Sequence, residues 1–383
     1  MSLETQPTRY EAYETRVATV VGGRGQLGSR IVQGLGGLGF NEVRVCEIDD
    51  SLTDSVRSST DLFFAVDAST TDQMLRSVYD LLGPQHSVLD GSSVKSTLIP
   101  VYHELDNHGI SVCSTHLGAV PAQPWRGVKV WLCEVGPNSE KAIRLATDLF
   151  LAKNTSIQKI NISDHEKVEQ DQFLTFFTMH LLAGALRQRE LPLSDFNKFA
   201  TLNAELAALA LGRTLGQGTV VPSEILHSQP RKKEFLDAIS GALEELKKGL
   251  DDRGKLQELM LQNIMFHDDP AGVIKSMFGK AGVVGARNAN LRMYAFSFRT
   301  TDDRPGKLRE LLGPFYEAGA NLTAIDSMPG VITPEEEQQG VDPDKIVDFD
   351  IGIDPDTIDP QKVARIKAAL TKMGCVIANR QIT

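Results

Sequence analysis

The stretch VATVVGGRGQLGS at residues 17–29 decides the fold of this 383-residue chain. A short apolar run at 17–21 leads into a glycine-rich turn, and an amphipathic segment follows at 26–38. A strand, a glycine-rich turn and a helix in this order are typical of an α/β domain with a parallel sheet. Further short apolar runs follow at 43–48, 61–66, 87–90, 111–114 and 128–134. Continuous apolar strands separated by helical segments predict a parallel sheet covered on both faces, over residues 16–158.

The glycines of the turn have the spacing of a dinucleotide-binding loop. Gly23 suits the tight turn, Gly25 lets the backbone approach a pyrophosphate, and Gly28 lets the helix pack closely on the strand. The first turn of the helix also offers N–H groups and a partial positive charge. Glu47 lies at the end of the next strand, about 20 residues beyond the last glycine, where it would bind the adenosine ribose and repel the additional phosphate of NADP. Asp49 is an alternative for this role. The sequence therefore predicts NAD as the cofactor, bound by Gly23, Arg24, Gly25, Gln26, Leu27, Gly28 and Glu47.

The sequence changes character after residue 158. Strand patterns nearly vanish, and apolar residues recur at three- and four-residue intervals within 194–215, 232–250 and 255–265. Ser163 and Glu166 have the spacing of a capping box, so a helix is expected to begin there. Residues 159–288 are therefore expected to form an all-helical domain, whose long apolar helices favour a homodimer.

The two ends of the chain have patterns of their own. Residues 290–383 show strands and amphipathic helices in the order βαββαβ, which is typical of a small ferredoxin-like module. Residues 1–15 are polar and acidic and are expected to be a disordered lead-in. The predicted fold class is α/β: a Rossmann-type parallel-sheet domain, an all-helical substrate and dimerisation domain, and a small α+β module.

The composition argues against several classes of function. The chain carries 50 acidic and 40 basic residues, a formal net charge of −10, and no basic block, which argues against nucleic-acid binding. No apolar run reaches the roughly 20 residues that span a membrane, and no signal or transit peptide is recognised. The four cysteines have neither metal-ligand nor redox spacing, so no metal site is expected. We therefore expect a cytoplasmic protein with buried, reduced thiols.

Further motifs resemble those of known families. The segments DGSSVK at 90–95 and STH at 114–116, with the glycine turn, Gly118 and Pro121, look like those of prephenate dehydrogenases, the enzymes of tyrosine biosynthesis. The helical segment continues the likeness, so it spans roughly residues 17–288. The segments RPGKL at 304–308 and GANLT at 319–323 resemble those of ACT regulatory domains.

The resemblance implies an NAD-dependent oxidative decarboxylation. In that family a ring alcohol loses its proton, a hydride leaves for NAD, and the ring carboxylate departs as carbon dioxide, so that prephenate becomes 4-hydroxyphenylpyruvate. An alcohol oxidation needs a group that accepts a proton near neutral pH, and histidine is the first candidate. His116 holds the position of the family's catalytic histidine. Ser93 corresponds to the serine that hydrogen-bonds the reacting hydroxyl or the histidine, and Lys95 beside it is expected to contact the substrate.

The substrate of that family is a dicarboxylate, so cationic groups are expected in the helical domain. Arg213, in the segment GRTLG at 212–216, resembles the arginine that holds the ring carboxylate, a task that suits a bidentate guanidinium. His180 resembles a histidine that faces the pyruvyl side chain. His165 resembles another family histidine, although more residues separate these two than is usual.

Some residues on the substrate side of the predicted cleft depart from the family pattern. Leu117 stands where proline is common, and Asp67 stands where proline or a small residue is usual. These departures leave hydride transfer credible and leave the substrate open. Arogenate and 4-amino-4-deoxyprephenate are the alternatives, because they would use the same cofactor and differ at one end of the molecule.

The resemblance to ACT domains implies a regulatory site for an aromatic amino acid. Asp303, Pro305, Gly306 and Asn321 would shape it between a strand end and a helix. Because Met328 stands where phenylalanine-sensing domains have arginine, tyrosine, phenylalanine and no ligand at all remain open. The alternative to an enzyme is a sensing protein that binds NAD and an amino acid without turnover. The presence of both a histidine and a serine at the catalytic positions argues against it.

Overall fold

The computed structural model describes residues 13–119, 125–198, 201–266, 295–302, 304–329, 336, 341 and 345–378. Most of the predicted lead-in, the loop at 120–124 and the predicted regulatory residue Asp303 lie outside these ranges. The chain divides into two compact units. The described residues of the first unit fall within 1–175, 217–230 and 331–344, and those of the second within 176–216, 231–330 and 345–383.

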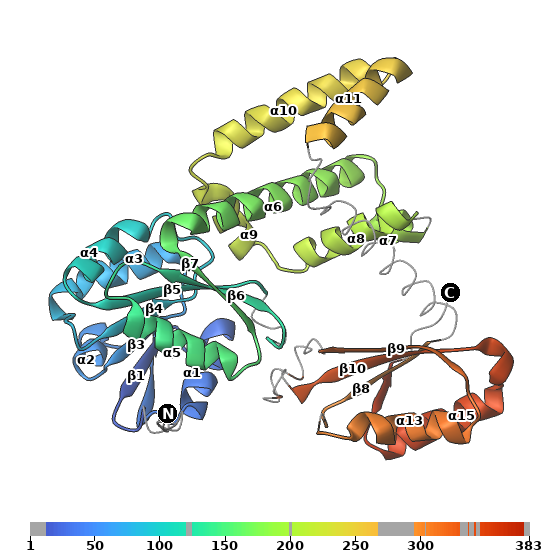
Figure 1. The fold of residues 1–383 in the computed structure, drawn as a ribbon, viewed down its shortest axis with the longest axis horizontal. Helices are drawn as coiled ribbons and strands as arrows, with labels where there is room; N and C mark the ends of the chain where they lie inside the picture. The colour runs from blue at the N-terminus through green and yellow to red at the C-terminus, as the bar shows by residue number, and fades with distance from the viewer. Residues whose placement is uncertain are drawn as a thin grey trace, which may run out of the picture. The chain divides into compact units, whose positions relative to one another are not determined.

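A seven-stranded sheet with the order β2-β1-β3-β4-β5-β6-β7 forms the centre of the first unit (Figure 1). Its strands are β1 (Val17–Val21), β2 (Glu42–Cys46), β3 (Asp61–Phe64), β4 (Ser87–Asp90), β5 (Ser111–Leu117), β6 (Lys129–Glu134) and β7 (Ser156–Asn161). Neighbouring strands are parallel except β5 and β6, which are antiparallel. The parallel-sheet α/β fold predicted from the apolar runs is confirmed, and β7 is a strand that the apolar pattern did not reveal.

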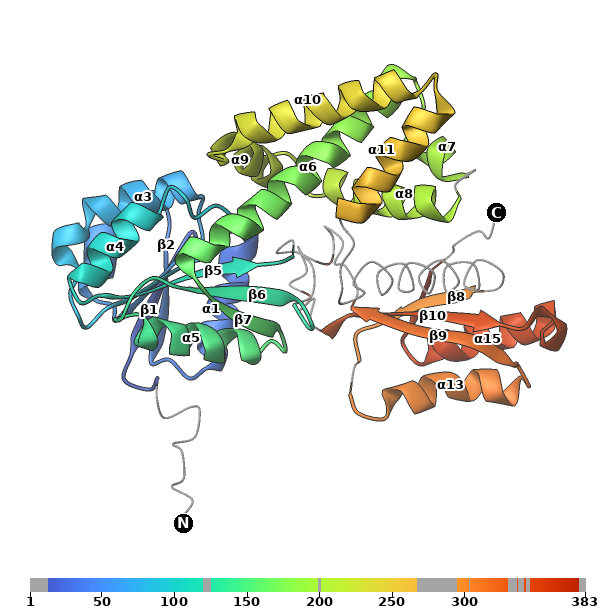
Figure 2. The same ribbon diagram turned by 45° about the horizontal axis from the view of Figure 1, so that its top comes forward.

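Helices cover both faces of this sheet (Figures 1 and 2). They are α1 (Gln26–Gly37), α2 (Leu52–Arg57), α3 (Ala68–Ser77), α4 (Ile99–Asn107) and α5 (Glu140–Leu151). Ile31 and Leu35 of α1, Leu145 and Leu149 of α5, and Phe63 of β3 belong to one buried core cluster. Because the sheet is covered on both sides, every residue of β3 and β4 is buried, which is why these strands are continuously apolar in their centres.

The order of the strands reverses at β1. Strand β2 lies on one side of β1 and β3 on the other. Ligands of open α/β sheets bind outside the carboxyl ends of the strands at such a switch point. The glycine turn follows β1 and Asp67 follows β3, so both stand at the place where the topology predicts a ligand.

The helical segment begins after β7 with a short 3₁₀ turn, Ile162–Asp164, which leads into α6 (His165–Gln188). The side chain of Asn161 caps this turn by accepting the N–H and the hydroxyl of Ser163, and α6 itself begins two residues after Ser163. The first part of α6 and α9 (Val220–Ser228) belong to the first unit. The second unit contains the rest of α6 and the helices α7 (Leu193–Lys198), α8 (Leu202–Leu215), α10 (Lys232–Gly249) and α11 (Arg253–Phe266). The predicted helical character is confirmed for the described residues of this segment from Ile162 to Phe266, and the strand β7 extends to Asn161.

A four-stranded antiparallel sheet with the order β11-β8-β10-β9 forms the described C-terminal part of the second unit. Its elements are β8 (Ala295–Thr300), α13 (Lys307–Glu317), β9 (Leu322–Pro329), β10 (Val347–Ile353), α15 (Pro360–Lys372) and β11 (Val376–Ala378). Both helices pack on one face of the sheet, where Phe298, Phe315, Ile351 and Leu370 are buried (Figure 2). The predicted βαββαβ order is confirmed.

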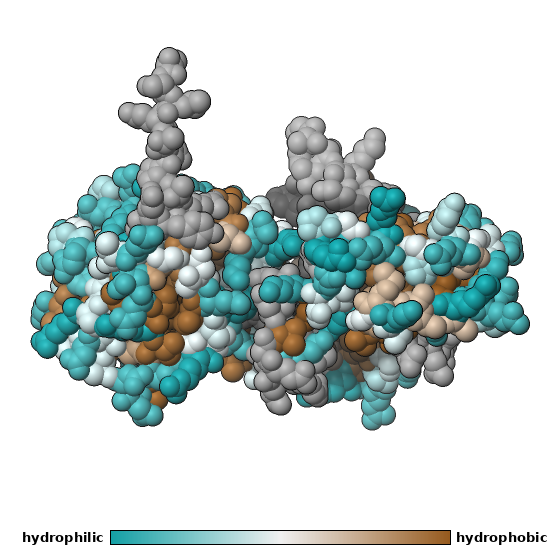
Figure 3. All heavy atoms as spheres, turned by 90° about the horizontal axis from the view of Figure 1, so that it is seen from below, coloured by the Kyte–Doolittle hydropathy of each residue, from teal (hydrophilic) through white to brown (hydrophobic). Residues whose placement is uncertain are grey.

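On the face drawn in Figure 3, hydrophilic and apolar side chains are mixed. Within the described ranges, no helix combines the length and the apolar character needed to cross a membrane. All four cysteines are buried as free thiols; they are Cys46, Cys113 and Cys133 in the first unit and Cys375 in the second.

Candidate active site

The glycine turn after β1 is a close-packed cradle. Gly22 has a φ of +74°, in the left-handed region that favours glycine. A Cβ on Gly28 would lie 2.1 Å from the carbonyl oxygen of Gly22 and 2.7 Å from the Cα of Gly23, so α1 packs directly on the turn. Gly25 is the N-cap of α1, and no side chain caps the helix. The first N–H groups of α1 are therefore available to an anion.

Glu47 stands beside this turn. It directly follows β2, and its Oε1 accepts the N–H of Arg24 at 2.7 Å. The carboxylate thus lies within one hydrogen bond of the turn, where the ribose of a nucleotide whose pyrophosphate is bound by α1 would reach it. The glycine cradle, the uncapped helix and the adjacent carboxylate together fit an NAD-type dinucleotide.

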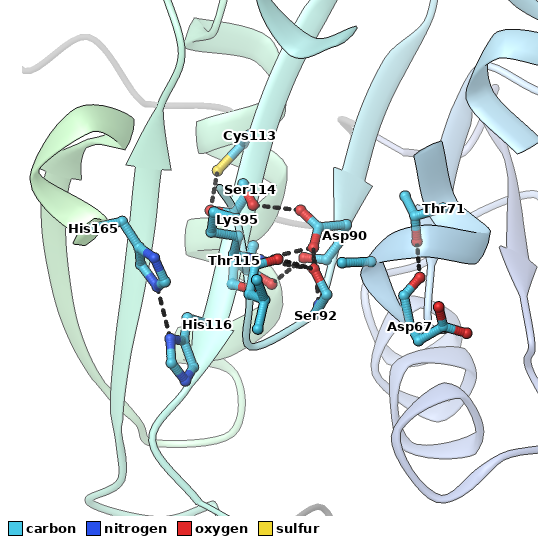
Figure 4. Close-up of polar contacts among 12 residues, drawn as sticks. Asp67, Thr71, Asp90, Ser92, Lys95, Cys113, Ser114, Thr115, His116 and His165 are labelled. Carbon is cyan, nitrogen blue, oxygen red and sulfur yellow. Dashed lines mark hydrogen bonds and ion pairs between the residues drawn. The ribbon is translucent and has the colours of Figure 1, made fainter. Parts of the chain in front are cut away.

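A second loop follows β4 and packs against the glycine turn. A Cβ on Gly91 would lie 2.5 Å from Cδ2 of Leu27, in the first turn of α1. The loop begins at the fully buried Asp90, whose Oδ2 accepts the N–H of Ser92 at 2.8 Å, its hydroxyl at 2.5 Å and the Nζ of Lys95 at 2.7 Å. The Oδ1 of Asp90 accepts the hydroxyl of Ser114 from β5 (Figure 4). One carboxylate therefore fixes the loop to the end of the neighbouring strand.

The ammonium group of Lys95 is fully buried and paired. Besides Asp90, it donates to the carbonyl oxygen of Thr115 at 2.8 Å and lies 3.5 Å from the hydroxyl of Ser92. Burial raises the pKa of the Asp90 carboxyl, but the ammonium of Lys95 and the hydroxyls of Ser114 and Ser92 outweigh burial and hold this pKa below its usual value. Asp90 and Lys95 are therefore a buried ion pair at neutral pH.

His116, near the carboxyl end of β5, begins a chain of hydrogen-bonded side chains. Its Nδ1 lies 2.7 Å from the Nε2 of His165, the first residue of α6 (Figure 4). The Nδ1 of His165 lies 3.2 Å from Oε1 of Glu169, one turn further along α6. The same Oε1 accepts the N–H of Lys95 at 2.6 Å and that of Ser96 at 3.2 Å. The first turns of α6 are thus joined both to β5 and to the loop after β4.

The ring of His116 is almost completely enclosed. Only 1% of this residue is exposed, its ring packs against Trp131 of β6, and its Nε2 lies 3.0 Å from the Nε2 of Gln172. Burial lowers the pKa of His116 well below its usual value, and the neighbouring His165 and Lys95 lower it further. Burial also lowers the pKa of His165, although its hydrogen bond to Glu169 acts in the opposite direction. His116 is therefore neutral near pH 7, as a proton acceptor has to be.

Two carboxylates meet at the end of α3 that follows β3. Asp67 is the N-cap of α3, and its Oδ1 accepts the N–H of Thr70 at 2.9 Å. Glu224 of α9 reaches the same helix end, where its Oε1 accepts the N–H of Ala68 at 3.2 Å. Burial raises the pKa of Glu224. The departure from the family pattern at position 67 therefore has a structural reason, because aspartate is a favoured N-cap.

The structure brings some of the predicted site residues together. His116 and Lys95 belong to one network, which Glu169 connects through hydrogen bonds. Ser93 is partly buried in the loop after β4, and among the described residues it has no hydrogen-bond partner; its neighbour Ser92 binds Asp90 instead. The catalytic role of Ser93 stays a prediction.

The other predicted residues lie in the second unit. Arg213 is exposed in α8 and His180 is half-buried in α6. Pro305 and Gly306 precede α13, and Gly306 is its N-cap with a φ of +88°. The N–H of Asn321 donates to Oγ1 of Thr357 at 2.9 Å. The substrate-binding and regulatory roles of these residues stay predictions.

Five residues of the network were not predicted as site residues from the sequence: Asp90, Glu169, Gln172, Ser92 and Ser114. Glu169 lies four residues after His165, and Gln172 three residues further, so the three share one face of α6. This spacing was the available signal. Nothing in the sequence separates Ser92 from Ser93 as the partner of Asp90.

The first unit thus offers a neutral histidine, a buried ion pair and an anion-binding turn at one edge of its sheet. In the described part of the chain, no group of three or more histidine, cysteine, aspartate and glutamate side chains is arranged to hold a metal ion. The residues present suit proton transfer next to a bound nucleotide.

No protein-family model and no curated protein matches the sequence, but solved structures match at low identity. The prephenate dehydrogenase of Aquifex aeolicus is 14% identical, covers 65% of this chain and 97% of its own, and has a TM-score of 0.47. The arogenate dehydrogenase of Synechocystis is 12% identical, covers 64% of this chain and 96% of its own, and has a TM-score of 0.40. An imine reductase variant of Myxococcus stipitatus, solved in complex with NAD⁺, is 16% identical, covers 71% of this chain and 94% of its own, and has a TM-score of 0.38. The solved structures that this chain is similar to thus include prephenate and arogenate dehydrogenases and an imine reductase.

Proposed function

We propose that this chain is an NAD-dependent dehydrogenase that converts prephenate to 4-hydroxyphenylpyruvate in tyrosine biosynthesis. The observation that carries the proposal is a neutral, hydrogen-bonded His116 at the sheet edge that also carries an uncapped glycine turn. An alcohol dehydrogenation needs a base and a dinucleotide site on the same side of a fold, and this edge supplies residues for both.

The proton and the hydride of the alcohol leave in different directions. When bound at the turn, NAD supplies the hydride acceptor. His116 takes the hydroxyl proton, Ser93 is proposed to orient the hydroxyl, and Arg213 and His180 are proposed to hold the two ends of the substrate. Lys95 already donates to Asp90 and Thr115, so we assign it the support of the loop rather than a contact to substrate.

The identity of the substrate rests on the resemblance of the segments at 90–95 and 114–116 to prephenate dehydrogenases. Arogenate and 4-amino-4-deoxyprephenate are the competing substrates. The α+β module is proposed to bind a regulatory aromatic amino acid. A homodimer is also proposed, and it is supported by the exposed leucines of α10, Leu236, Leu243 and Leu246.

The test is an assay of NADH or NADPH formation with prephenate, arogenate and 4-amino-4-deoxyprephenate in parallel. Each substrate is tested with NAD and with NADP, and in the presence and absence of tyrosine and phenylalanine. We expect NAD-dependent turnover of prephenate. His116→Asn should lower kcat by about 10²- to 10⁴-fold, the usual contribution of general base catalysis, and should leave NAD affinity unchanged. His103→Asn, an exposed position on α4, is the matched control and should keep full activity.

Other results would redirect the proposal. Turnover of arogenate alone would change the substrate and keep the alcohol oxidation. Turnover of 4-amino-4-deoxyprephenate alone would also change the reacting group, from a ring alcohol to a ring amine. An equal loss of NAD affinity and turnover in His116→Asn would make this histidine structural. A protein that binds NAD and transfers no hydride from any of the three compounds would be the sensing protein named as the alternative.

A further inference from the structure

Whether His116 can act as a base depends on which ring nitrogen carries its proton. The hydrogen bonds of the network decide this. Oε1 of Glu169 accepts two backbone N–H groups, from Lys95 and Ser96, and such donors favour an ionised carboxylate. An ionised carboxylate only accepts hydrogen bonds, so the Nδ1 of His165 that faces it is the protonated nitrogen.

The protonation of His165 in turn determines which ring nitrogen of His116 carries its proton. A neutral His165 with its proton on Nδ1 has a free lone pair on Nε2, and this lone pair faces Nδ1 of His116 at 2.7 Å. Nδ1 of His116 is therefore the donor, and Nε2 of His116 is the nitrogen without a proton. The opposite assignment would place a lone pair of His165 against the carboxylate.

We propose that Glu169 and His165 are positioning residues that hold His116 as the Nδ1–H tautomer and stabilise the imidazolium formed when Nε2 takes the proton of the substrate hydroxyl. The proposal deepens the proposed function and rests on His116 being the base. Neither positioning residue touches the reacting atoms, and both act through the ring of His116.

Gln172 lies on the other side of the His116 ring. Its side-chain nitrogen, a donor, lies 3.0 Å from Nε2 of His116, and its Oε1 is buried without a hydrogen-bond partner among the described residues. The two ends of an amide are told apart by their partners, so this contact fits the Nδ1–H tautomer, with Nε2 as the acceptor, and the assignment itself rests on Glu169 and His165. The substrate hydroxyl, also a donor, takes the place of this amide when it binds.

The proton balance of the step is simple. The hydroxyl proton moves to Nε2 of His116, and the ring then carries one positive charge. Its Nδ1–H remains hydrogen-bonded to His165, behind which stands the negative charge of Glu169. The other charges near these rings are those of Lys95 and Asp90, which form an ion pair with each other. The carboxylate of Glu169 is therefore the group left to compensate the new charge.

The first test reads the tautomer directly in the ligand-free protein. Long-range ¹H–¹⁵N NMR of ¹⁵N-histidine-labelled protein separates a protonated from a free ring nitrogen, and the His116→Asn variant assigns the signals of His116. We expect Nδ1 protonated and Nε2 free. Finding the proton on Nε2 of His116 would overturn the proposal.

The second test is the variant Glu169→Gln, which keeps the shape and removes the charge. The matched control is Glu166→Gln, the same change one turn earlier at an exposed position of α6. Glu169→Gln should lower kcat by about 10²-fold or more, with KM and NAD affinity within about threefold of the control, and should shift the acid limb of the pH–kcat profile to lower pH. Glu169→Asp, which restores the charge, should recover part of the loss.

The two tests separate this proposal from the function it rests on. If no substrate is turned over but the Nδ1–H tautomer is present and is lost in Glu169→Gln, the network stands and the proposed reaction fails. If prephenate is turned over and Glu169→Gln matches Glu166→Gln in kcat and pH profile, the reaction stands and the positioning role fails. A variant that does not fold still leaves the tautomer of the unmodified protein as the deciding measurement.

Discussion

Lys95→Met is the substitution whose effect the structure specifies most closely. It removes the ammonium that pairs with the fully buried Asp90 and donates to the carbonyl oxygen of Thr115. The carboxylate keeps the hydrogen bonds donated by Ser92 and Ser114. Breaking one side of a buried ion pair costs about 3–5 kcal/mol, because the remaining charge is uncompensated. Asp90→Asn should cost a similar amount through the stranded ammonium.

The double variant gives the sharper result. With both Lys95→Met and Asp90→Asn no charge is left. The amide oxygen, in the place of Oδ2, can still accept the N–H and the hydroxyl of Ser92, and the amide NH2, in the place of Oδ1, can donate to the hydroxyl of Ser114. The double variant should therefore be more stable than either single variant, since removing both charges of a buried pair is often neutral. If the effects of the two substitutions on stability simply added, the double variant would be less stable than both single variants.

Hydrogen exchange measured by mass spectrometry is the suitable assay, because a chain with two units does not unfold in one step. A cost of about 3–5 kcal/mol corresponds to exchange roughly 100- to 4,000-fold faster in peptides that cover β4 and β5. Peptides of β8 and β10, in the second unit, serve as the internal control. Exchange of β4 and β5 within about tenfold of the unmodified protein in Lys95→Met would refute the reasoning, as would a double variant less stable than both singles.

Two further predictions concern the glycine turn and the buried histidines. Gly28→Ala should lower NAD affinity by about tenfold or more in a calorimetric titration, because the new Cβ would lie 2.1 Å from the carbonyl oxygen of Gly22. The control is Gly36→Ala, whose Cβ would meet nothing within 4 Å and which should bind NAD normally. Equal NAD affinities of the two variants would show that the turn does not hold the cofactor. The pKa of His116 lies well below the 6.5 of an exposed histidine, so below that pH the unfolded chain binds more protons than the folded one. The stability of the first unit should therefore be full above about pH 6.5 and fall as the pH is lowered further, and hydrogen exchange of β5 should show a weaker fall in His116→Asn.

The sheet was predictable because its central strands β3 and β4 are fully buried and apolar in their centres. Strand β7 escaped this reasoning because SIQKIN, at the edge of the sheet, has no buried position. The residue that caps the 3₁₀ turn after β7 was also not predicted. Asn161 and Ser163 are both good caps, and only the path of the chain out of the edge strand decides between them.

The site was predictable only in part. His116 could be named because its motif resembles that of a known family, although it lies within β5 rather than after the strand, but its partners depend on contacts between segments far apart in the sequence. His165 is 49 residues away, and Glu169 is 74 residues from the N–H of Lys95 that it accepts. The direction in which Ser92 and Ser93 point depends on the local turn of the loop, which residue types alone do not determine. The hydrogen bonds of the network therefore depend on how α6 packs against the sheet, which the sequence alone does not give.

The four buried thiols make the chain its own reporter of unfolding. A cysteine reacts as the thiolate, and burial both blocks access and raises the pKa of Cys46, Cys113, Cys133 and Cys375. Each becomes reactive only when the core around it opens. Because three thiols lie in the first unit and one lies in the second, a single labelling reagent followed by peptide mass spectrometry would time the opening of both units in one sample, without an engineered probe.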